Sequence, residues 1–198
     1  EGSERNFLAA IPVLESQLGP DHSSTLSALN NLGYLYHRRN DKAAAERIHR
    51  DLLARQISKQ GLVHESVGDS YQNLAGAITH QGRFEESIPL HRKAYEIFGS
   101  VMNADNYKIA LPLLSIAYAE LQLANAMAAE EAAREALGRL ESTAPGTVLE
   151  GVAMCLVGLA LEQQGQISEG SDLVLRSHPL LGTSRAPEPY PKLCRLAD

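Results

Sequence analysis

Hydrophobic residues recur at steps of three and four along most of the chain. The clearest example is two runs with a polar break between them: Leu29, Leu32, Leu35 and Tyr36, then Ala44, Ala45, Ile48, Leu52 and Leu53. Such steps place side chains on one face of an α-helix. The break between the runs, "RRND", and the later breaks "HQGRF" and "QQGQI" contain an Asn or a Gly. Both residues tolerate the left-handed backbone that ends a helix, so each pair of runs predicts a helical hairpin.

The hairpin pattern repeats about every 42 residues. Pairs of an aliphatic and a small residue mark successive copies, 42, 42 and 41 residues apart: Leu32-Gly33, Leu74-Ala75, Ile116-Ala117 and Val157-Gly158. The loops keep the same register, with 42 residues between His22 and His64 and again between His64 and Asn106. The small residue of each pair falls where the two helices of a hairpin cross, and a larger side chain there would hold the helices apart.

This register divides the chain into repeats. Three residues near the start align at twice the period with three residues of a later second helix: Ser3, Phe7 and Ala10 with Ser87, His91 and Ala94. The first segment is therefore expected to be the second helix of a truncated repeat. The expected boundaries of the array, 1–177, are residues 1–22 for that helix and its loop, 23–64, 65–106 and 107–146 for full repeats, and 147–177 for a degenerate capping repeat.

Two segments depart from the pattern. In the third repeat Glu120 stands at an apolar position and Ala124 replaces the turn Gly, so this hairpin is expected to pack less tightly. The fourth repeat has Gly170 where the others have Ala or Ser. After Ser177 the sequence "HPLLGTSRAPEPYPKLCRLAD" contains four prolines and cannot form another full hairpin. Residues 178–198 are predicted to be a Pro-rich C-terminal tail.

Composition narrows the class of protein. The 198 residues are 44% hydrophobic and 21% charged, which suits one soluble domain or a short repeat array. No apolar run approaches the roughly 18 residues of a membrane span, and no signal segment is present, so we expect a cytoplasmic protein without a membrane partner. Because the sequence lacks an initiator Met, we expect a fragment of a longer chain. Cys155 and Cys194 lie in different segments without metal-site spacing, and we expect plain thiols.

Charge argues against one class of partner. The net charge of −6 is opposite to what phosphate binding requires, so no nucleic acid partner is predicted. The charge is uneven: residues 37–59 contain seven Lys or Arg against three acids, and residues 118–172 contain nine acids against two arginines. This pattern has two alternative explanations. One is that the charges lie on solvated helix faces, and the other is a partner site or head-to-tail self-association of the basic and acidic halves.

Candidate catalytic and metal-binding chemistry is weak. The chain has no Gly-rich phosphate loop, no nucleophile elbow and no His pair with the spacing of a helical zinc site. The acidic pair Glu130-Glu131 falls on a second helix and is expected to be solvated surface. We therefore predict a protein that is not an enzyme and has no cofactor and no metal.

The repeat resembles a known family. Its pattern is similar to that of the tetratricopeptide repeat. The shared features are the aliphatic-small pair, the aromatic or aliphatic residue after it, the turn Gly, and the small residues Ala45, Ser87 and Ala129. "LGPDHSSTLSALNNLGYLY" resembles the long-period variety of kinesin light chains and of bacterial multidomain proteins, in which such repeats follow kinase or regulatory domains. The resemblance implies an all-α, right-handed superhelical solenoid of helical hairpins. It covers about Ser3 to Ser177, with roughly one extra helical turn per helix over the usual period of about 34 residues.

The resemblance also suggests where a ligand would bind. First helices of such hairpins line the concave face, and the residues just before each small pair point into this groove. Asn31 and Asn73 occupy equivalent places there, with Asn30 and Gln72 one residue earlier. In related proteins an Asn at this site bonds the backbone of an extended peptide, because its amide both donates and accepts. The alternative is that these amides bridge adjacent repeats without a ligand.

The remaining groove candidates belong to the same face of the first helices. They are Tyr34, Arg38, His80, Ser115, Tyr118 and Gln122, of which Arg38 could grip a carboxylate. The predicted function is protein–protein interaction, with an extended peptide or partner segment in the concave groove. Two alternatives stay open: a regulatory sensor array that binds a signalling peptide or a neighbouring domain of the same chain, and a self-assembly module.

Overall fold

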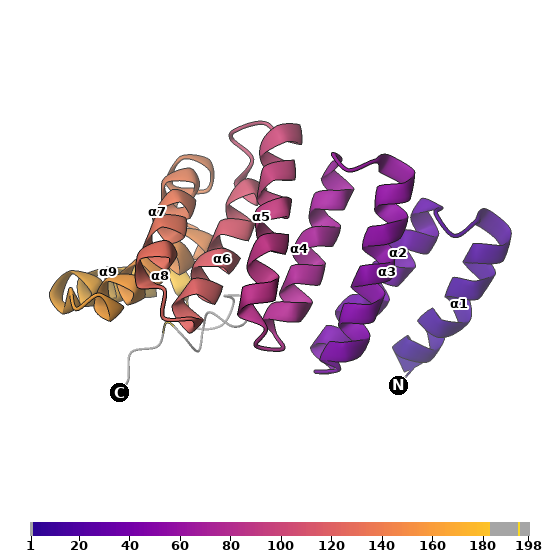
Figure 1. The fold of residues 1–198 in the computed structure, drawn as a ribbon, viewed down its shortest axis with the longest axis horizontal. Helices are drawn as coiled ribbons and strands as arrows, with labels where there is room; N and C mark the ends of the chain where they lie inside the picture. Colours follow the sequence, from indigo (N-terminus) through magenta and orange to yellow (C-terminus); the bar gives the residue numbers. More distant parts are fainter. Residues whose placement is uncertain (1, 183–193, 195–198) are drawn as a thin grey trace. The chain divides into compact units, whose positions relative to one another are not determined.

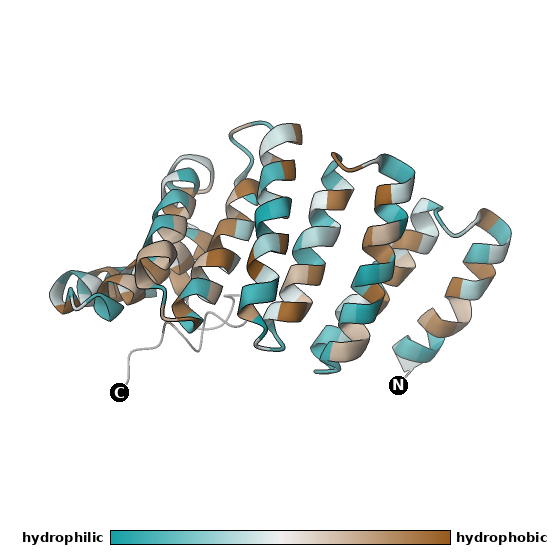
Figure 2. Ribbon diagram, in the orientation of Figure 1, coloured by the Kyte–Doolittle hydropathy of each residue, from teal (hydrophilic) through white to brown (hydrophobic). Residues whose placement is uncertain are grey.

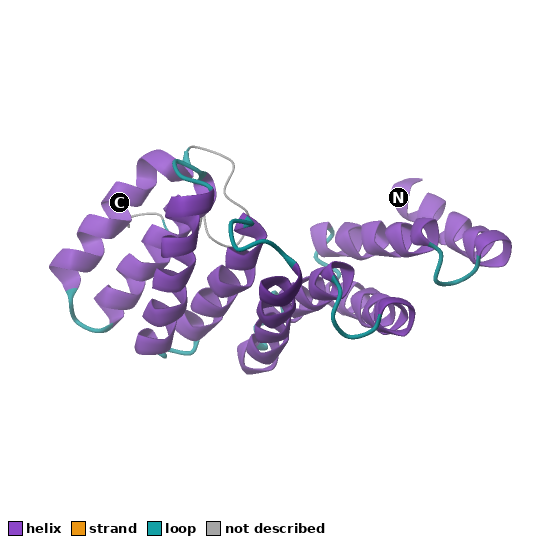
Figure 3. Cartoon of the chain, turned by 90° about the horizontal axis from the view of Figure 1, so that it is seen from above, coloured by secondary structure: helices purple, strands orange, loops and turns teal. Residues whose placement is uncertain are grey.

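All regular structure in the described part of the chain is helical, as predicted. The computed structural model describes residues 2–182 and Cys194. Figures 1 and 3 show helices joined by loops. The helices are α1 Gly2–Leu18, α2 Ser23–Arg38, α3 Lys42–Gln60, α4 Glu65–Thr79, α5 Phe84–Val101, the short 3-10 helix η1 Tyr107–Ile109, α6 Ala110–Gln122, α7 Ala126–Thr143, α8 Val148–Gln163 and α9 Ile167–Leu181.

The helices form two compact units, which we call unit 1 (residues 1–101) and unit 2 (residues 102–198). Within unit 1 each helix from α1 to α5 packs on the next in sequence, and within unit 2 the same holds from α6 to α9. Consecutive helical hairpins are therefore confirmed. Every helix of unit 1 carries both hydrophilic and hydrophobic segments in Figure 2, as expected of helices with one buried side.

The turn inside each hairpin has the same backbone conformation in all four copies. Positive φ angles occur at Asn40 (61°), Gly82 (78°), Ala124 (58°) and Gly165 (84°), which are 42, 42 and 41 residues apart. In each copy the following N–H donates to a carbonyl near the end of the first helix, as Asn125 N–H does to the Glu120 oxygen at 2.9 Å. This is the Schellman arrangement that closes a helix.

The helices of a hairpin approach closely at the small residues. A Cβ atom added to Gly33 would lie 2.7 Å from the imidazole of His49, and one added to Gly158 would lie 2.6 Å from the backbone oxygen of Gly170. Ala75 and Ala117, at the same repeat position, are fully buried. The small residues therefore stand at the helix crossings, where the sequence placed them.

The recurring loop residues are helix caps. The imidazole Nδ1 atoms of His22 and His64 accept the backbone N–H groups of Ser24 and Ser66, each at 3.2 Å. Asn106 does the same for Lys108 at 3.0 Å with its side-chain oxygen. A side-chain acceptor at this position satisfies a backbone donor that the helix itself leaves unpaired. The 42-residue spacing of these residues thus marks the starts of helical segments.

A polar clamp joins the second helix of one repeat to the turn inside the next hairpin. In unit 1 the Glu46 carboxylate accepts the Gln81 amide at 2.6 Å and forms an ion pair with Arg50 at 2.7 Å. Unit 2 repeats this clamp with Glu130, which accepts the Gln164 amide at 2.6 Å and the Arg134 guanidinium at 2.7 Å. These hydrogen bonds, Arg134 first and then Gln164, lower the pKa of Glu130. Glu130, expected to be part of a charged surface, is half-buried and has in addition a structural role as the acceptor of this clamp.

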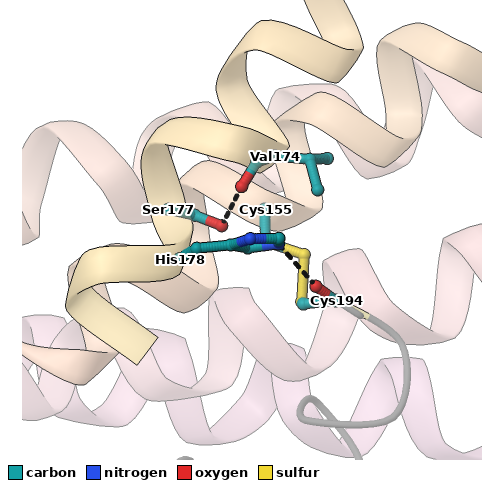
Figure 4. Close-up of a disulfide and its surroundings, with 5 residues drawn as sticks. All are labelled: Cys155, Val174, Ser177, His178 and Cys194. Atoms are coloured by element: carbon teal, nitrogen blue, oxygen red, sulfur yellow. Dashed lines mark hydrogen bonds between the residues drawn. A yellow bond between two sulfur atoms is a disulfide. The ribbon is translucent and has the colours of Figure 1, made fainter. Parts of the chain in front are cut away.

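The two cysteines are joined, and the expectation of plain thiols is wrong. Cys155 of α8 forms a disulfide with Cys194, with 5.9 Å between their Cα atoms (Figure 4). A sequence separation of 39 residues gave no indication of this proximity. Helix α9 continues to Leu181, past the expected start of the tail at residue 178. The rest of the predicted Pro-rich tail, except Gly182 and Cys194, lies outside the described residues.

Candidate peptide-binding pocket

Unit 1 contains a pocket of about 690 Å³ between α2 and α4, with residues of α3 in its wall. We call it the unit 1 pocket. Nine of its fourteen lining residues carry a neutral hydroxyl or amide group. The lining residues are Ser23, Leu26, Ser27, Asn30, Asn31, Leu52, Gln56, Lys59, Gln60, His64, Ser66, Asp69, Ser70 and Asn73. Such groups can donate and accept hydrogen bonds without the desolvation cost of a full charge.

The asparagines predicted for the groove all line this pocket. Asn31 is exposed on the wall formed by α2. Asn73 donates its amide to the side-chain oxygen of Asn30 at 3.0 Å, which links α4 to α2. The structure therefore brings Asn30, Asn31 and Asn73 together, and two of them make the bridge between repeats that the sequence left as the alternative role.

Gln72 is turned toward the second helix of its own hairpin. Its side-chain oxygen lies 2.8 Å from Nδ1 of His91 in α5, and Nε2 of His91 lies 3.3 Å from the Thr79 hydroxyl. His91 is 1% exposed, and its burial lowers its pKa from 6.5 to about 3. A neutral imidazole satisfied on both sides is a packing group, and Gln72 is part of its environment.

Three other candidates in unit 1 lie toward the C-terminal ends of α2 and α4, beyond the residues that line the unit 1 pocket. His80, the C-cap residue of α4, stacks edge-on against His37 of α2 with 4.1 Å between ring centroids. Burial, followed by the positive charges of His37 and Lys42, lowers the pKa of His80 to about 4. Tyr34 is 62% exposed, and Arg38 is exposed at the end of α2. None of these three residues lines the unit 1 pocket.

The candidates of unit 2 lie on α6. Ser115 is half-buried and donates its hydroxyl to the Leu111 carbonyl at 3.3 Å, and Tyr118 is also half-buried. Gln122 lines a smaller pocket of about 290 Å³, which we call the unit 2 pocket, together with Leu121, Leu159, Glu162 and Gln163. Ser115 and Tyr118 are not among its lining residues.

Part of the basic stretch at residues 37–59 is paired inside unit 1. Arg50 lies 3.1 Å from Glu86 in addition to its contact with Glu46. Arg55 forms ion pairs with Glu15 at 2.6 Å and with Asp51 at 2.9 Å. These arginines hold α3 to α1 and to α5, so part of the basic charge has an intramolecular role.

A sequence profile of the tetratricopeptide repeat family matches residues 1–58 and 66–142. The chain is a tetratricopeptide repeat protein. Tetratricopeptide repeats are generally protein–protein interaction modules, and no catalytic family is found for this chain. Curated protein sequences give no significant match.

Solved structures share this fold and confirm the resemblance to kinesin-light-chain-like repeats. One is the Q17M variant of the nearly identical TPR-like repeats of a kinesin light chain from Podosopora anserina. It has a TM-score of 0.76 at 16% identity, and the match covers 88% of this chain and 82% of that one. BtubC (BKLC) from P. vanneervenii has a TM-score of 0.71 at 17% identity, over 89% and 69%. A Rap protein complexed with competence and sporulation factor has a TM-score of 0.67 at 16% identity, over 88% and 48%.

Several lining residues of this tetratricopeptide repeat pocket were not predicted. Gln56, Lys59 and Gln60 come from the second helix α3, whereas all the predicted groove residues were placed on first helices. The C-terminal end of α3 reaches the pocket between α2 and α4, and a helical pattern in the sequence does not report which helix ends meet there. The capping residue His64, by contrast, could have been found from its spacing to His22, since both stand at the start of a first helix.

The described residues contain no group of three or more His, Cys, Asp or Glu side chains placed to hold a metal ion. Among the helices of residues 2–182, none combines the length and the apolar character that crossing a membrane requires.

Proposed function

We propose that unit 1 binds an extended peptide segment of a partner protein in the unit 1 pocket, and that the module acts by binding rather than by catalysis. The observation that supports this most strongly is the lining of the pocket, which is dominated by hydroxyl and amide groups. An extended backbone offers alternating donors and acceptors, and a side-chain amide can meet both. Asn31, exposed on the wall, is the residue assigned to this contact.

The fold relatives are compatible with this proposal. A Rap protein of similar fold is known in complex with competence and sporulation factor, so hairpin arrays of this kind accommodate a bound factor. Lys59 is the one lysine of the lining, and its Nζ donates to the backbone oxygen of Asp21 at 2.7 Å. We therefore expect the ligand to be recognised through its backbone and neutral side chains rather than through a strong negative charge.

The experiment is a selection from a displayed library of random peptides, followed by affinity measurements on the selected peptides. Asn31→Ala should weaken binding by about 1–3 kcal/mol, because a ligand amide is then buried without a partner. The melting temperature should change little, since the exposed side chain contributes little to packing and Ala favours the helix.

The controls separate binding from architecture. Asn103→Ala, at an exposed loop position after α5, is the matched substitution that should leave both affinity and stability unchanged. Asn73→Ala removes the hydrogen bond to Asn30 and should lower stability as well as affinity. Selected peptides that bind Asn31→Ala as tightly as the wild type would refute the proposed pocket.

A further inference from the structure

The loop between α3 and α4 carries two aliphatic residues in succession, and both are exposed. Leu62 is 64% exposed and Val63 is 63% exposed. Figure 2 shows this loop in the brown of hydrophobic residues. Single exposed apolar residues are normal on a protein surface, whereas adjacent ones form a contiguous apolar surface that a ligand can cover. We call Leu62 and Val63 the apolar pair.

The repeat does not require apolar residues at these two positions. The loop between α1 and α2 has a Gly with positive φ at its start and a capping His at its end, as the loop between α3 and α4 does. In the places of the apolar pair, 42 residues earlier, it has Pro20 and Asp21. The next copy, 42 residues later, has Ala104 and Asp105. Because the same loop folds with an aspartate in place of Val63, and because both side chains are exposed, the apolar pair contributes little to folding.

The apolar pair lies at the rim of the unit 1 pocket. Gln60 comes shortly before it and His64 directly after it, and both residues line the pocket. Consecutive Cα atoms are about 3.8 Å apart, so the backbone of Val63 is adjacent to the pocket wall. The Ser66 hydroxyl donates to the side-chain oxygen of Gln56 at 3.0 Å, which ties the start of α4 to the end of α3. The loop that carries the apolar pair is therefore held at both of its ends.

The helix geometry gives the distance from this rim to the asparagines of the pocket. Asn73 bonds to Asn30, the neighbour of Asn31, so these three residues lie at one level of the pocket. From His64 to Asn73 the chain advances nine residues along α4, which is about 14 Å at 1.5 Å per residue. An extended peptide advances about 3.3–3.6 Å per residue. About four peptide residues therefore span the distance between the asparagines and the apolar pair.

We propose that the apolar pair binds an aliphatic or aromatic side chain of the peptide in the unit 1 pocket, about four residues along from the peptide group that Asn31 bonds. Contact between apolar side chains removes both from water, which is favourable. A polar ligand group placed against the apolar pair would lose its hydration without gaining a hydrogen-bond partner. This inference rests on the proposed function and narrows its ligand class to extended segments with a hydrophobic residue toward one end.

The test is a double-mutant cycle with peptides selected from a displayed random library on the wild-type chain. Leu62→Asn/Val63→Thr keeps the approximate shape of both side chains and removes their apolar character. It should weaken binding of a selected peptide about tenfold and leave the melting temperature unchanged. Serine in place of the hydrophobic residue of the peptide should weaken binding to the wild type by a similar factor. The serine peptide should then bind the wild type and the double variant equally, because the contact is already lost.

The matched control is Leu8→Asn, which makes the same exchange at an exposed site of α1 that does not line the pocket, and it should leave the affinity unchanged. A peptide that Asn31→Ala weakens and Leu62→Asn/Val63→Thr does not weaken would refute this inference and leave the proposed function in place. Peptides that are insensitive to Asn31→Ala would refute both.

Sedimentation of the wild type and of Leu62→Asn/Val63→Thr distinguishes a peptide contact from self-association. We expect the two chains to have the same mass in solution at the concentrations of the binding assay. A wild type that dimerises, and a double variant that does not, would show that the apolar pair binds a second copy of the chain and would overturn the inference.

Discussion

Units 1 and 2 place different chemistry at the same positions of one repeat. Opposite the small residue of the helix crossing stand His49 and His91 in unit 1, and Ala133 and Val174 in unit 2. Two residues before the aliphatic residue of each small pair the contrast is similar: unit 1 has Asn30 and Gln72, and unit 2 has Leu114 and Cys155. The hairpin therefore restricts volume at its crossing and backbone conformation at its turn, and leaves polarity free to vary.

The crossing histidines of unit 1 are polar groups in an apolar place. His91 is satisfied by Gln72 and Thr79. His49 is 5% exposed, and its Nδ1 is buried with no hydrogen-bond partner among the described residues. Burial, and then the charge of nearby His37, lowers the pKa of His49 from 6.5 to about 4. Unit 2 has no histidine at this position, so acid should affect the two units differently.

The largest expected effect is the loss of stability of unit 1 in mild acid. Above pH 6.5 both the folded and the unfolded chain hold these imidazoles neutral. Between pH 6.5 and about 4 only the unfolded chain binds the protons, so the free energy of unfolding falls as the pH falls. At pH 5 the loss should be about 2 kcal/mol for each of His49 and His91. Hydrogen exchange of α4 at pH 7.5 and pH 5 measures it.

Two comparisons sharpen this prediction. The double variant His49→Ala/His91→Ala places alanine at both crossings, as unit 2 does with Ala133. This variant should be less stable at pH 7.5, but its free energy of unfolding should fall much less on acidification than that of the wild type. Hydrogen exchange of α8, corrected for the intrinsic effect of pH, should show a smaller change than α4. An equal acid response of wild type and double variant would mean that other groups, such as the carboxylates of the clamps, control the acid stability.

The fold was predictable because its determinants are local and repeated. Helical periodicity, the turn residues Asn40 and Gly82 and the small residues at the crossings each recur at 42 residues, so every copy supports the others. The site was only partly predictable. The repeat register placed Asn31 and Asn73 on one face, but the bond from Asn73 to Asn30, rather than to a ligand, depends on the distance between two helices. The disulfide escaped prediction because nothing in the register relates Cys194 to α8.

A Gly→Ala substitution at a helix crossing should destabilise more when the new Cβ meets backbone than when it meets a side chain. In Gly158→Ala the new Cβ would lie 2.6 Å from the Gly170 backbone oxygen, and helix α9 must shift to relieve this contact. We expect a loss of about 3 kcal/mol in the free energy of unfolding of unit 2. In Gly33→Ala the new Cβ meets the His49 side chain, which can turn, and unit 1 should lose about 1–2 kcal/mol. Denaturant unfolding of each variant gives both values.

A further substitution tests whether volume alone decides this ranking. Gly138→Ala, on α7, adds the same methyl group at an exposed site, where no heavy atom outside the adjacent backbone of the helix lies within 4 Å of the new Cβ. Because Ala is the better helix former, this variant should gain about 0.5–1 kcal/mol. If Gly158→Ala instead destabilises no more than Gly33→Ala does, the α8–α9 crossing is less rigid than its glycine pair indicates.

The smallest expected effect concerns the turn of the third repeat, where Ala124 holds φ at 58°. The left-handed conformation costs a residue with a Cβ roughly 1–2 kcal/mol, and the equivalent Gly82 and Gly165 avoid this cost. Glycine loses about 0.5–1 kcal/mol more backbone entropy on folding, so Ala124→Gly should stabilise unit 2 by a net amount of about 0.5–1 kcal/mol. Denaturant unfolding of this variant measures the gain.

The reverse exchange in unit 1 is the matched control. Gly82→Ala places a Cβ in open space, with no heavy atom within 4 Å beyond its own residue and its two chain neighbours, so any change comes from the backbone conformation alone. It should destabilise unit 1 by about the amount that Ala124→Gly stabilises unit 2, because the two turns share one Schellman geometry. A stabilising Gly82→Ala would show that the turn leaves the left-handed conformation in solution. Stability changes of opposite sign and similar size in the two variants would show that alanine at position 124 has a local conformational cost. The buried contacts between α6 and α7 then offset this cost in the folded hairpin.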